Sequence, residues 1–251
     1  MSAAQLLQKQ DINDIAKLLE RSCQNFYQVE TAINWDLPVV CPSSISKEMY
    51  IDSVSQLLHA ERFAVKLCTK TSHRVSDFDS QSYLLVQAME EQRHARMYEK
   101  YIQLIGDVKE VNPAMDAIYR SVYEWDGNPL ATILALNFFI EGEAINQQGK
   151  RIRTLPCPLF REINRIIIKD EGRHHAFGTL YAKKFLPTVS KIELSEILSW
   201  IKNLWTKWDD NNKNRYLEDS EGVVRNDSHE LNQRFSGHLK DLEKIGIYLG
   251  N

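Results

Sequence analysis

Carboxylate and imidazole side chains recur in this sequence as two sets of three residues. The first set is Glu61, Glu91 and His94, and a shift of 80 positions carries it onto the second set, Glu141, Glu171 and His174. In each set the first glutamate precedes the second by 30 positions, and the histidine follows three positions later. Carboxylate and imidazole ligands suit iron and manganese better than copper(I). The pattern therefore predicts a site for two metal ions, to which each set gives two carboxylates and one imidazole.

Helices are the elements that would position these ligands. Residues three apart lie on one face of an α-helix, so each Glu-x-x-His pair can reach one ion. A separation of 30 suits a helical hairpin whose two carboxylates each lie about 15 residues from the turn, near the middle of a long bundle. Glu143 is an alternative ligand on the third helix, but the 80-residue shift favours Glu141.

The apolar residues of the chain recur with a period near 3.6, which predicts a mostly helical protein. Each of four central helices carries an acid in the middle of its apolar face, which is costly unless the acid is paired, protonated or bound to metal. We expect one helical domain over residues 1–251, with a bundle core at about 45–187 and flanking helices in 1–44 and 188–251. Further expected elements are a short helix at 114–125, a capped helix from 190, a polar loop at 208–228 and a last helix near 229–246.

Two more acids precede the metal-binding glutamates by one position. A metal-bound histidine usually donates its second ring N–H to a carboxylate, which fixes its tautomer and orientation. Glu90 and Asp170 are placed to do this across the two hairpins. We predict that Glu90 pairs with His174 and that Asp170 pairs with His94.

Composition and charge exclude several classes of protein. The net charge is −3 and there is no basic stripe, so we expect no nucleic-acid partner. No apolar run approaches the ~18 residues that a membrane span needs. The four cysteines are scattered, as is typical of reduced thiols, and the N-terminus lacks the apolar run of a signal peptide. We therefore expect a soluble cytoplasmic protein.

The motifs "EEQRH" and "DEGRH", preceded by "HAERF" and "FIEGE", resemble the ferritin-like di-iron carboxylate superfamily over residues 45–187. Within it they are most similar to the branch of ribonucleotide-reductase small subunits and di-iron oxidases and oxygenases. The resemblance implies an all-α, ferritin-like four-helix bundle with additional N- and C-terminal helices. It also implies a cofactor of two Fe ions, with Mn/Fe as the alternative, and O2 as co-substrate.

This resemblance makes a non-heme di-iron oxidase or oxygenase of a small organic substrate the leading hypothesis. No flavin or iron–sulfur motif is present, so the electrons would come from an external reductase or ferredoxin, or from the substrate. A homodimer is left open. In aminobenzoate N-oxygenase-like enzymes a third histidine lies one turn before the last metal glutamate. Ile167 stands at that position here, so we expect the chain to lie outside that subfamily.

Tyr98 follows His94 by one helical turn and faces the same way. The resemblance places it where the radical tyrosine of ribonucleotide-reductase small subunits lies, so a radical-generating protein is one alternative. The other interpretation of Tyr98 is a pocket residue. A ferroxidase or iron-binding protein is the second alternative function.

Residues one turn from the expected ligands are candidates for the substrate pocket. Gln87 and Asn137 each precede a metal glutamate by four positions and could contact substrate, a metal-bound water or a ligand carboxylate. Phe138, Met97 and Phe177 would form an apolar wall beside the metals, or part of the core.

Overall fold

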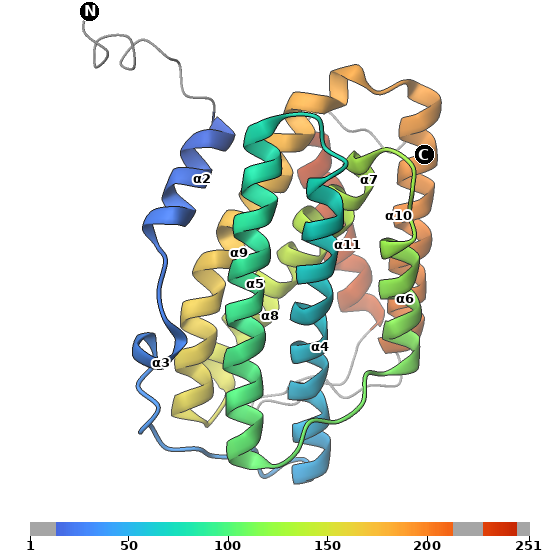
Figure 1. Ribbon diagram of the computed structural model, residues 1–251. Helices are drawn as coiled ribbons and strands as arrows, with labels where there is room; N and C mark the ends of the chain where they lie inside the picture. The colour runs from blue at the N-terminus through green and yellow to red at the C-terminus, as the bar shows by residue number, and fades with distance from the viewer. Residues whose placement is uncertain (1–13, 213–227, 245–251) are drawn as a thin grey trace, which may run out of the picture.

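Two helical hairpins packed against each other form the centre of the protein (Figure 1). The first consists of α4 (Lys47–Ser72) and α5 (Phe78–Ile105). The second pairs a composite helix with α9 (Pro158–Phe185). The composite helix runs through α7 (Pro129–Ile133), η1 (Leu134–Ile140) and α8 (Glu141–Thr154). The predicted all-α bundle is thereby confirmed, and the residues that the structure describes, 14–212 and 228–244, contain no strand.

The bundle helices begin where the sequence offers a side chain that can accept a hydrogen bond. Ser46, Asp77 and Asn128 each accept a backbone N–H from the first turn of α4, α5 and α7. Pro129 and Pro158 occupy first-turn positions, where the missing N–H costs nothing. These caps fix the start of each helix and hence the height at which its central acid lies.

The third bundle helix departs from the uniform α-helix expected from its apolar period. Leu134–Ile140 form a π-helical segment, η1, immediately before Glu141. A π turn widens the helix and shifts the faces on which its side chains lie. Nδ1 of His175 is 3.2 Å from the carbonyl oxygens of both Asn137 and Phe138 and donates its hydrogen to this segment.

Further helices cover the bundle. On one side α2 (Asp14–Gln24) packs against α5 and α9, and α3 (Val29–Ala32) follows it. On another side lie α6 (Pro113–Tyr123), the 3-10 turn η2 (Leu186–Thr188), α10 (Lys191–Asn212) and α11 (Ser228–Lys244). The predicted cap at residue 190 is present, because Ser190 Oγ accepts the backbone N–H of Glu193. Most of the predicted polar loop falls at 213–227, outside the described residues.

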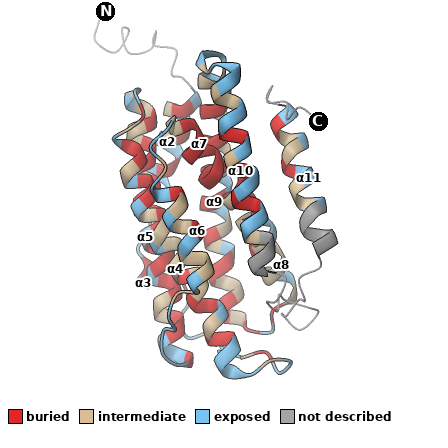
Figure 2. Ribbon diagram, turned by 90° about the vertical axis from the view of Figure 1, so that its right-hand side faces the viewer, coloured by how far each residue is buried: buried red, intermediate tan, exposed pale blue. Residues whose placement is uncertain are grey.

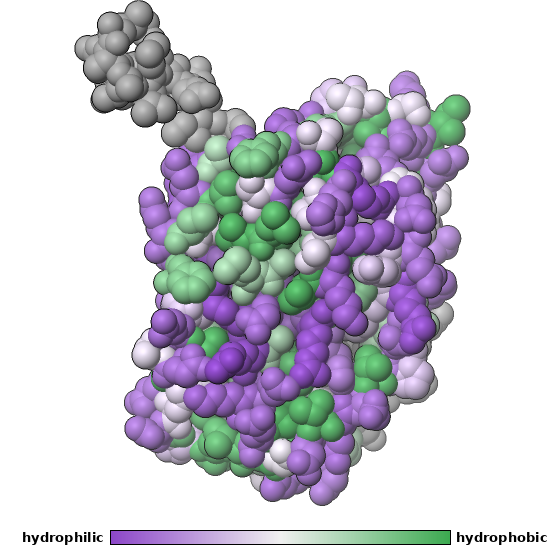
Figure 3. Space-filling model, viewed as in Figure 1, coloured by the Kyte–Doolittle hydropathy of each residue, from purple (hydrophilic) through white to green (hydrophobic). Residues whose placement is uncertain are grey.

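The buried residues gather on the inward faces of the helices, and α7 and η1 are buried almost all round (Figure 2). The outer surface in Figure 3 is mostly hydrophilic, with apolar side chains gathering over α2 and the neighbouring part of α5. Leu85 and Met89 of α5 are exposed apolar residues, and so is Phe26, which lies two residues after α2. No described helix combines the length and the apolar character that crossing a bilayer requires.

Gly178 on α9 lets that helix approach the π-helical segment closely. A Cβ atom at this position would lie 2.8 Å from Asn137 Cβ and 2.9 Å from its carbonyl carbon. Because backbone atoms cannot move aside, Gly178→Ala should lower the free energy of unfolding by about 1–3 kcal/mol. Chemical denaturation would measure this change.

Gly172→Ala is the matched control on the same helix, because a Cβ there meets no atom within 4 Å. Its free energy of unfolding should stay level or rise by up to about 1 kcal/mol, since alanine favours the helix. Equal losses in the two variants would contradict the close-approach account.

Candidate metal centre

The six predicted ligands converge at the middle of the bundle. One group of donor atoms comes from Glu61, Glu91, His94 and Glu171, and a second comes from Glu91, Glu141, Glu171 and His174. Within each group, the donor atoms lie within 4.8 Å of one another. Glu91 and Glu171 belong to both groups, so each can bridge two ions. The remaining glutamate and the histidine of each group belong to that group alone, so they would bind one ion only.

Both histidines present Nδ1 to this cluster. Nδ1 of His94 is 3.1 Å from Glu91 Oε2 and 3.5 Å from Glu171 Oε1. Nδ1 of His174 is 3.0 Å from Glu171 Oε2 and 3.1 Å from Glu91 Oε1. The ring centroids of the two histidines are 6.0 Å apart, and the carboxylates of Glu91 and Glu171 each lie close to both imidazoles.

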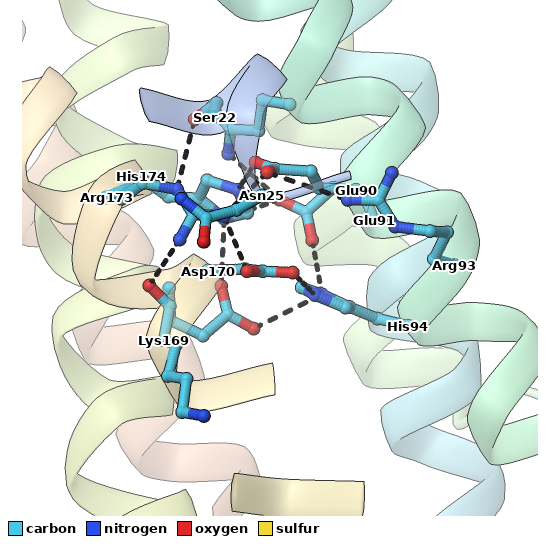
Figure 4. A network of polar contacts seen from close by, with 12 residues as sticks. Ser22, Asn25, Glu90, Glu91, Arg93, His94, Lys169, Asp170, Arg173 and His174 are labelled. Atoms are coloured by element: carbon cyan, nitrogen blue, oxygen red, sulfur yellow. Dashed lines mark hydrogen bonds and ion pairs between the residues drawn. The ribbon is translucent and has the colours of Figure 1, made fainter. Parts of the chain in front are cut away.

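The other ring nitrogen of each histidine meets an acid from the opposite hairpin. His174 Nε2 is 2.8 Å from Glu90 Oε2, and His94 Nε2 is 3.1 Å from Asp170 Oδ2 (Figure 4). These are the two pairs expected from the sequence. With the hydrogen on Nε2 donated to a carboxylate, Nδ1 would be the nitrogen that offers its lone pair to a metal ion.

A single arginine joins the two outer acids. Nη2 of Arg173 is 2.7 Å from Glu90 Oε1 and 2.5 Å from Asp170 Oδ1. Contacts with His94 and Arg173 hold the pKa of Asp170 well below its usual range, although burial opposes this. Asp170 is therefore held as a carboxylate, the form that accepts a histidine N–H.

Helix α2 and the residues that follow it cover Arg173 on the outer side of the bundle. Ser22 Oγ accepts a hydrogen bond from Arg173 Nε at 3.1 Å, and the Tyr27 hydroxyl donates to Asp170 Oδ2 at 2.8 Å. The guanidinium carbon of Arg93 lies 4.5 Å from the ring centroid of Tyr27. These contacts place the outer acids beneath a protein layer that limits access of water to them.

The charge of the cluster shows that its residues fit a pair of cations. Burial, together with the charges of nearby carboxylates, raises the pKa of Glu61 to about 8. Burial and the charges of Glu171 and Glu91 hold the pKa of Glu141 well above its usual range. The protein thus supplies too little positive charge to keep all four glutamates ionised. Two divalent cations would supply the missing charge and accept the oxygen and nitrogen donors present.

Buried amides support the ligand carboxylates. Gln87 Nε2 donates to Glu91 Oε1 at 2.9 Å and to Glu141 Oε1 at 3.1 Å. Asn137 in turn donates to Gln87 Oε1 at 2.7 Å. Gln87 thus contacts ligand carboxylates directly, whereas Asn137 contacts Gln87 and the backbone carbonyl of His174. Gln148, which the sequence did not indicate, is 3.3 Å from Glu171 Oε1.

A cavity of about 740 Å³ opens beside the cluster. Glu61, Glu141 and Glu171 form part of its wall, so it reaches the proposed metal ligands. Glu61 has the most exposed side chain of the six, at 12%, because it borders this space. The other walls come mainly from α4, α6, η1, α8 and α10.

The five residues predicted to form the pocket do not belong to the wall of this cavity. Gln87, Asn137, Phe138, Met97 and Phe177 are all buried and do not line the cavity. The π turn places Leu136 and Phe139 on the cavity wall, whereas Phe138 faces His175 at a centroid distance of 5.0 Å. Phe177 stacks on the ring of Tyr83, with the two ring centroids 4.3 Å apart.

Tyr98 is fully buried and lines the cavity. Its hydroxyl has no hydrogen-bond partner among the described residues. Burial, with a smaller effect from the Glu61 charge, raises the pKa of this phenol far above its usual range. The phenol therefore keeps its proton in this environment.

Glu143 points away from the six-residue cluster and pairs with the C-terminal helix. Its Oε1 is 2.9 Å from His238 Nε2, and its Oε2 is 2.9 Å from Arg234 Nε. Both Glu143 and Arg234 border the cavity. Of the two alternatives on the third helix, Glu141 is thus the one that lies with the other donor groups.

Sequence reasoning missed several of these contacts. The 80-residue shift that relates the ligands also carries Arg93 onto Arg173, so the arginine between the acids had a signal in the sequence. Gln148 follows Glu141 by seven positions, which places it two turns along the same helical face. Arg234 and His238 gave no such signal, because nothing in the spacing relates α11 to the bundle.

Comparison with known proteins places this geometry among di-iron enzymes. Residues 63–208, more than half of the chain, match the family model described as p-aminobenzoate N-oxygenase AurF. The expectation that the chain lies outside this subfamily was wrong. Ile167 does replace the expected third histidine, and it is fully buried among apolar residues one turn before Glu171. The family match therefore does not depend on a histidine at that position.

Solved structures share the fold at low sequence identity. A protein from Synechococcus with aldehyde deformylating oxidase activity matches with a TM-score of 0.61 and 15% identity, over 80% of this chain and 90% of that one. A point mutant of an R2-like ligand-binding oxidase, with an aerobically reconstituted Mn/Fe cofactor, matches with a TM-score of 0.61 and 14% identity. That match covers 93% of this chain and 94% of the other. No curated protein matches the sequence.

Arg173→Ala tests the role of the arginine between the outer acids. The substitution leaves Glu90 and Asp170 buried without their shared cation, so the free energy of unfolding should fall by about 3–5 kcal/mol. Urea denaturation of the metal-free protein would measure it. Arg165→Ala, on the same helix, removes only a solvent-exposed ion pair with Glu162 and should cost at most about 1 kcal/mol. A loss at Arg173 no larger than this control would contradict the assignment.

Proposed function

The chain belongs to the family of the p-aminobenzoate N-oxygenase AurF, and from this premise we propose that it is a non-heme di-iron oxidase or oxygenase that uses O2 to oxidise a small organic molecule. One observation carries the proposal. Two groups of donor atoms that share Glu91 and Glu171 lie at the inner wall of a cavity large enough for an organic ligand. An iron-storing ferroxidase needs no such cavity, so the cavity favours oxidation of an organic molecule.

The donor set supports a pair of iron ions, and an Mn/Fe pair is the alternative, as in the R2-like oxidase that shares the fold. When bound, the metal pair supplies the redox chemistry that activates O2. We propose Glu61, Glu91 and His94 from the first hairpin, with Glu141, Glu171 and His174 from the second, as its ligands.

The remaining residues of the site would hold these ligands in place. Glu90 and Asp170 accept the Nε2 hydrogens of the two histidines and so orient both rings. Gln87 holds carboxylate oxygens of Glu91 and Glu141 through its amide group. The apolar walls of the cavity would exclude water from the reacting centre and orient the substrate.

The proposal extends to the partners of the reaction. The sequence contains no flavin or iron–sulfur motif, so we propose that a reductase or ferredoxin delivers the electrons. The cytoplasm, where the scattered cysteines would stay reduced, is the proposed location. The proposal also includes a single domain over the whole chain and assembly into a homodimer.

Iron stoichiometry tests the proposed ligands. Glu141 belongs to one group of donors only, so Glu141→Ala should reduce the iron retained after desalting from about two ions per chain to about one. Glu91→Ala should weaken both sites, because Glu91 belongs to both groups. Elemental analysis of anaerobically loaded protein would measure these values.

Glu143→Ala is the matched control, since it removes an acid two positions away that pairs with Arg234 and His238 instead. This variant should retain two ions. Loss of iron from Glu143→Ala, with full retention by Glu141→Ala, would transfer the ligand role to Glu143. Wild-type protein that binds no iron would overturn the proposed function.

Tyr98→Phe separates an oxygenase from a radical-generating protein. We propose Tyr98 as a residue of the cavity wall, because its hydroxyl has no described partner that could take its proton. Uptake of O2 by the iron-loaded variant with a chemical reductant should stay within about threefold of wild type. A sharp radical signal in the EPR spectrum of the wild type that disappears in Tyr98→Phe would support the radical alternative instead.

A further inference from the structure

A second hollow of the protein is an apolar groove on the outer side of α4 and α5. Its wall includes Val65 and Thr69 of α4, Leu85 and Met89 of α5, and Phe26. Phe26, Leu85 and Met89 are 61%, 48% and 55% exposed. Figure 3 shows apolar side chains gathered over α2 and the neighbouring part of α5. Exposed apolar groups gathered at one place are typical of a surface that binds another molecule.

The groove lies on the back of a helix that carries proposed metal ligands. Successive residues of an α-helix are turned by about 100°, so residues two apart face nearly opposite directions. Met89 and Gln92 line the groove, and the ligands Glu91 and His94 follow them by two positions each. The width of α5, about 10–12 Å with its side chains, therefore separates the groove from the proposed metal centre.

A buried arginine connects the groove with the centre. Arg93 lines the groove, and its Nη2 is 3.6 Å from Glu90 Oε1. The other oxygen of this carboxylate, Oε2, is 2.8 Å from His174 Nε2. Nε and Nη2 of Arg93 have no hydrogen-bond partner among the described residues. The groove wall therefore carries a positive charge that lies two contacts from a candidate metal ligand.

The charged residues around the groove are basic. Residues 62–72 of α4 and 81–98 of α5 contain two acids, Glu90 and Glu91, and both are buried. The charged side chains of these stretches that reach the surface are those of Arg62, Lys66, Lys70 and Arg96. Acids that pair with three of these four come from outside the two stretches. A rim with basic residues and no exposed acid of its own favours a partner with an acidic surface.

The extent of the groove suits a transient partner. Eight residues line it, whereas a stable protein interface uses about 20–30 residues on each side. Weak electron-transfer complexes have the smallest interfaces. Among the described residues, none lines both the groove and the cavity, so a partner in the groove would leave the cavity open to substrate.

We propose that this groove is the docking site of a small one-electron carrier protein with an acidic surface. The inference rests on the proposed function, because it takes the metal pair as the acceptor of the electrons. Each encounter oxidises one reduced carrier and delivers one electron, so two encounters supply the two electrons that convert a pair of ferric ions to ferrous ions. The groove adds the place at which the electron donor binds and the charge of its surface.

Met89→Glu tests the docking site, because it puts a negative charge in the groove and removes an apolar contact. Binding of an acidic ferredoxin to the metal-free protein at low ionic strength should weaken about tenfold or more, as isothermal titration calorimetry would show. Leu104→Glu is the matched control. Leu104 lies on the same helix, is 53% exposed against 55% for Met89, and does not line the groove. Its variant should bind the ferredoxin within about twofold of the wild type.

The rate of electron transfer gives a second measurement on the same variants. Reduction of the iron-loaded protein by reduced ferredoxin would be followed by stopped-flow absorbance without oxygen. The second-order rate constant should fall about tenfold or more in Met89→Glu and stay unchanged in Leu104→Glu. Dithionite, a small reductant that needs no docking site, should reduce all three proteins at equal rates. Cytochrome c, a basic carrier, should bind the wild type more weakly than the ferredoxin does.

Three results would overturn the proposal. They are a wild type that does not bind the ferredoxin, a wild type that binds cytochrome c more tightly, and equal binding of the ferredoxin by Met89→Glu and Leu104→Glu. A dimer that dissociates only in Met89→Glu, detected by sedimentation equilibrium, would instead make the groove a contact between two copies of this chain.

Iron content and O2 uptake with dithionite, measured on the same preparations, keep the two proposals apart. A protein that holds two ions and consumes O2, but whose reaction with the ferredoxin is insensitive to Met89→Glu, refutes the docking site alone. A protein that retains no iron refutes the proposed function.

Discussion

The cost of burying four carboxylates at the centre of a helical bundle constrains the rest of this structure. Each of the four central helical stretches brings one such group into an apolar interior, where an unpaired charge is strongly unfavourable. Protein groups offset only part of this cost, as the raised pKa values of Glu61 and Glu141 indicate. Bound cations would offset the rest of this cost. The surrounding helices hold the four carboxylates close together at the centre of the bundle.

The two halves of the bundle are related by an 80-residue shift, but the protein uses them differently. Glu61 and Glu141 both border the cavity, but only Glu141 is followed two positions later by an acid, Glu143, which pairs with α11. The second hairpin alone contains a π turn, which brings Leu136 and Phe139 to the cavity and leaves Phe138 against His175. The candidate ligands thus follow the 80-residue shift. The cavity wall includes positions at which the two hairpins differ.

This difference explains which features could be predicted from the sequence. The ligands and the two outer acids follow from residue types at regular spacing, because a helix converts spacing directly into a shared face. The part of the cavity wall formed by η1 did not follow, because a π turn shifts the faces of this segment and the sequence carries no clear mark of it. The contacts of Arg234 and His238 depend on how α11 packs against distant helices. Family membership could not be predicted from Ile167 either. The match extends over residues 63–208 and does not depend on one histidine.

Arg173 has a consequence for how the two halves of the centre behave together. Its Nη2 contacts the acid that orients His174 and also the acid that orients His94. A movement of this guanidinium toward one acid weakens its contact with the other, so the two imidazoles are not oriented independently. Arg173 thus links the orientation of one imidazole to that of the other through the two acids it contacts, although it is not itself among the candidate ligands.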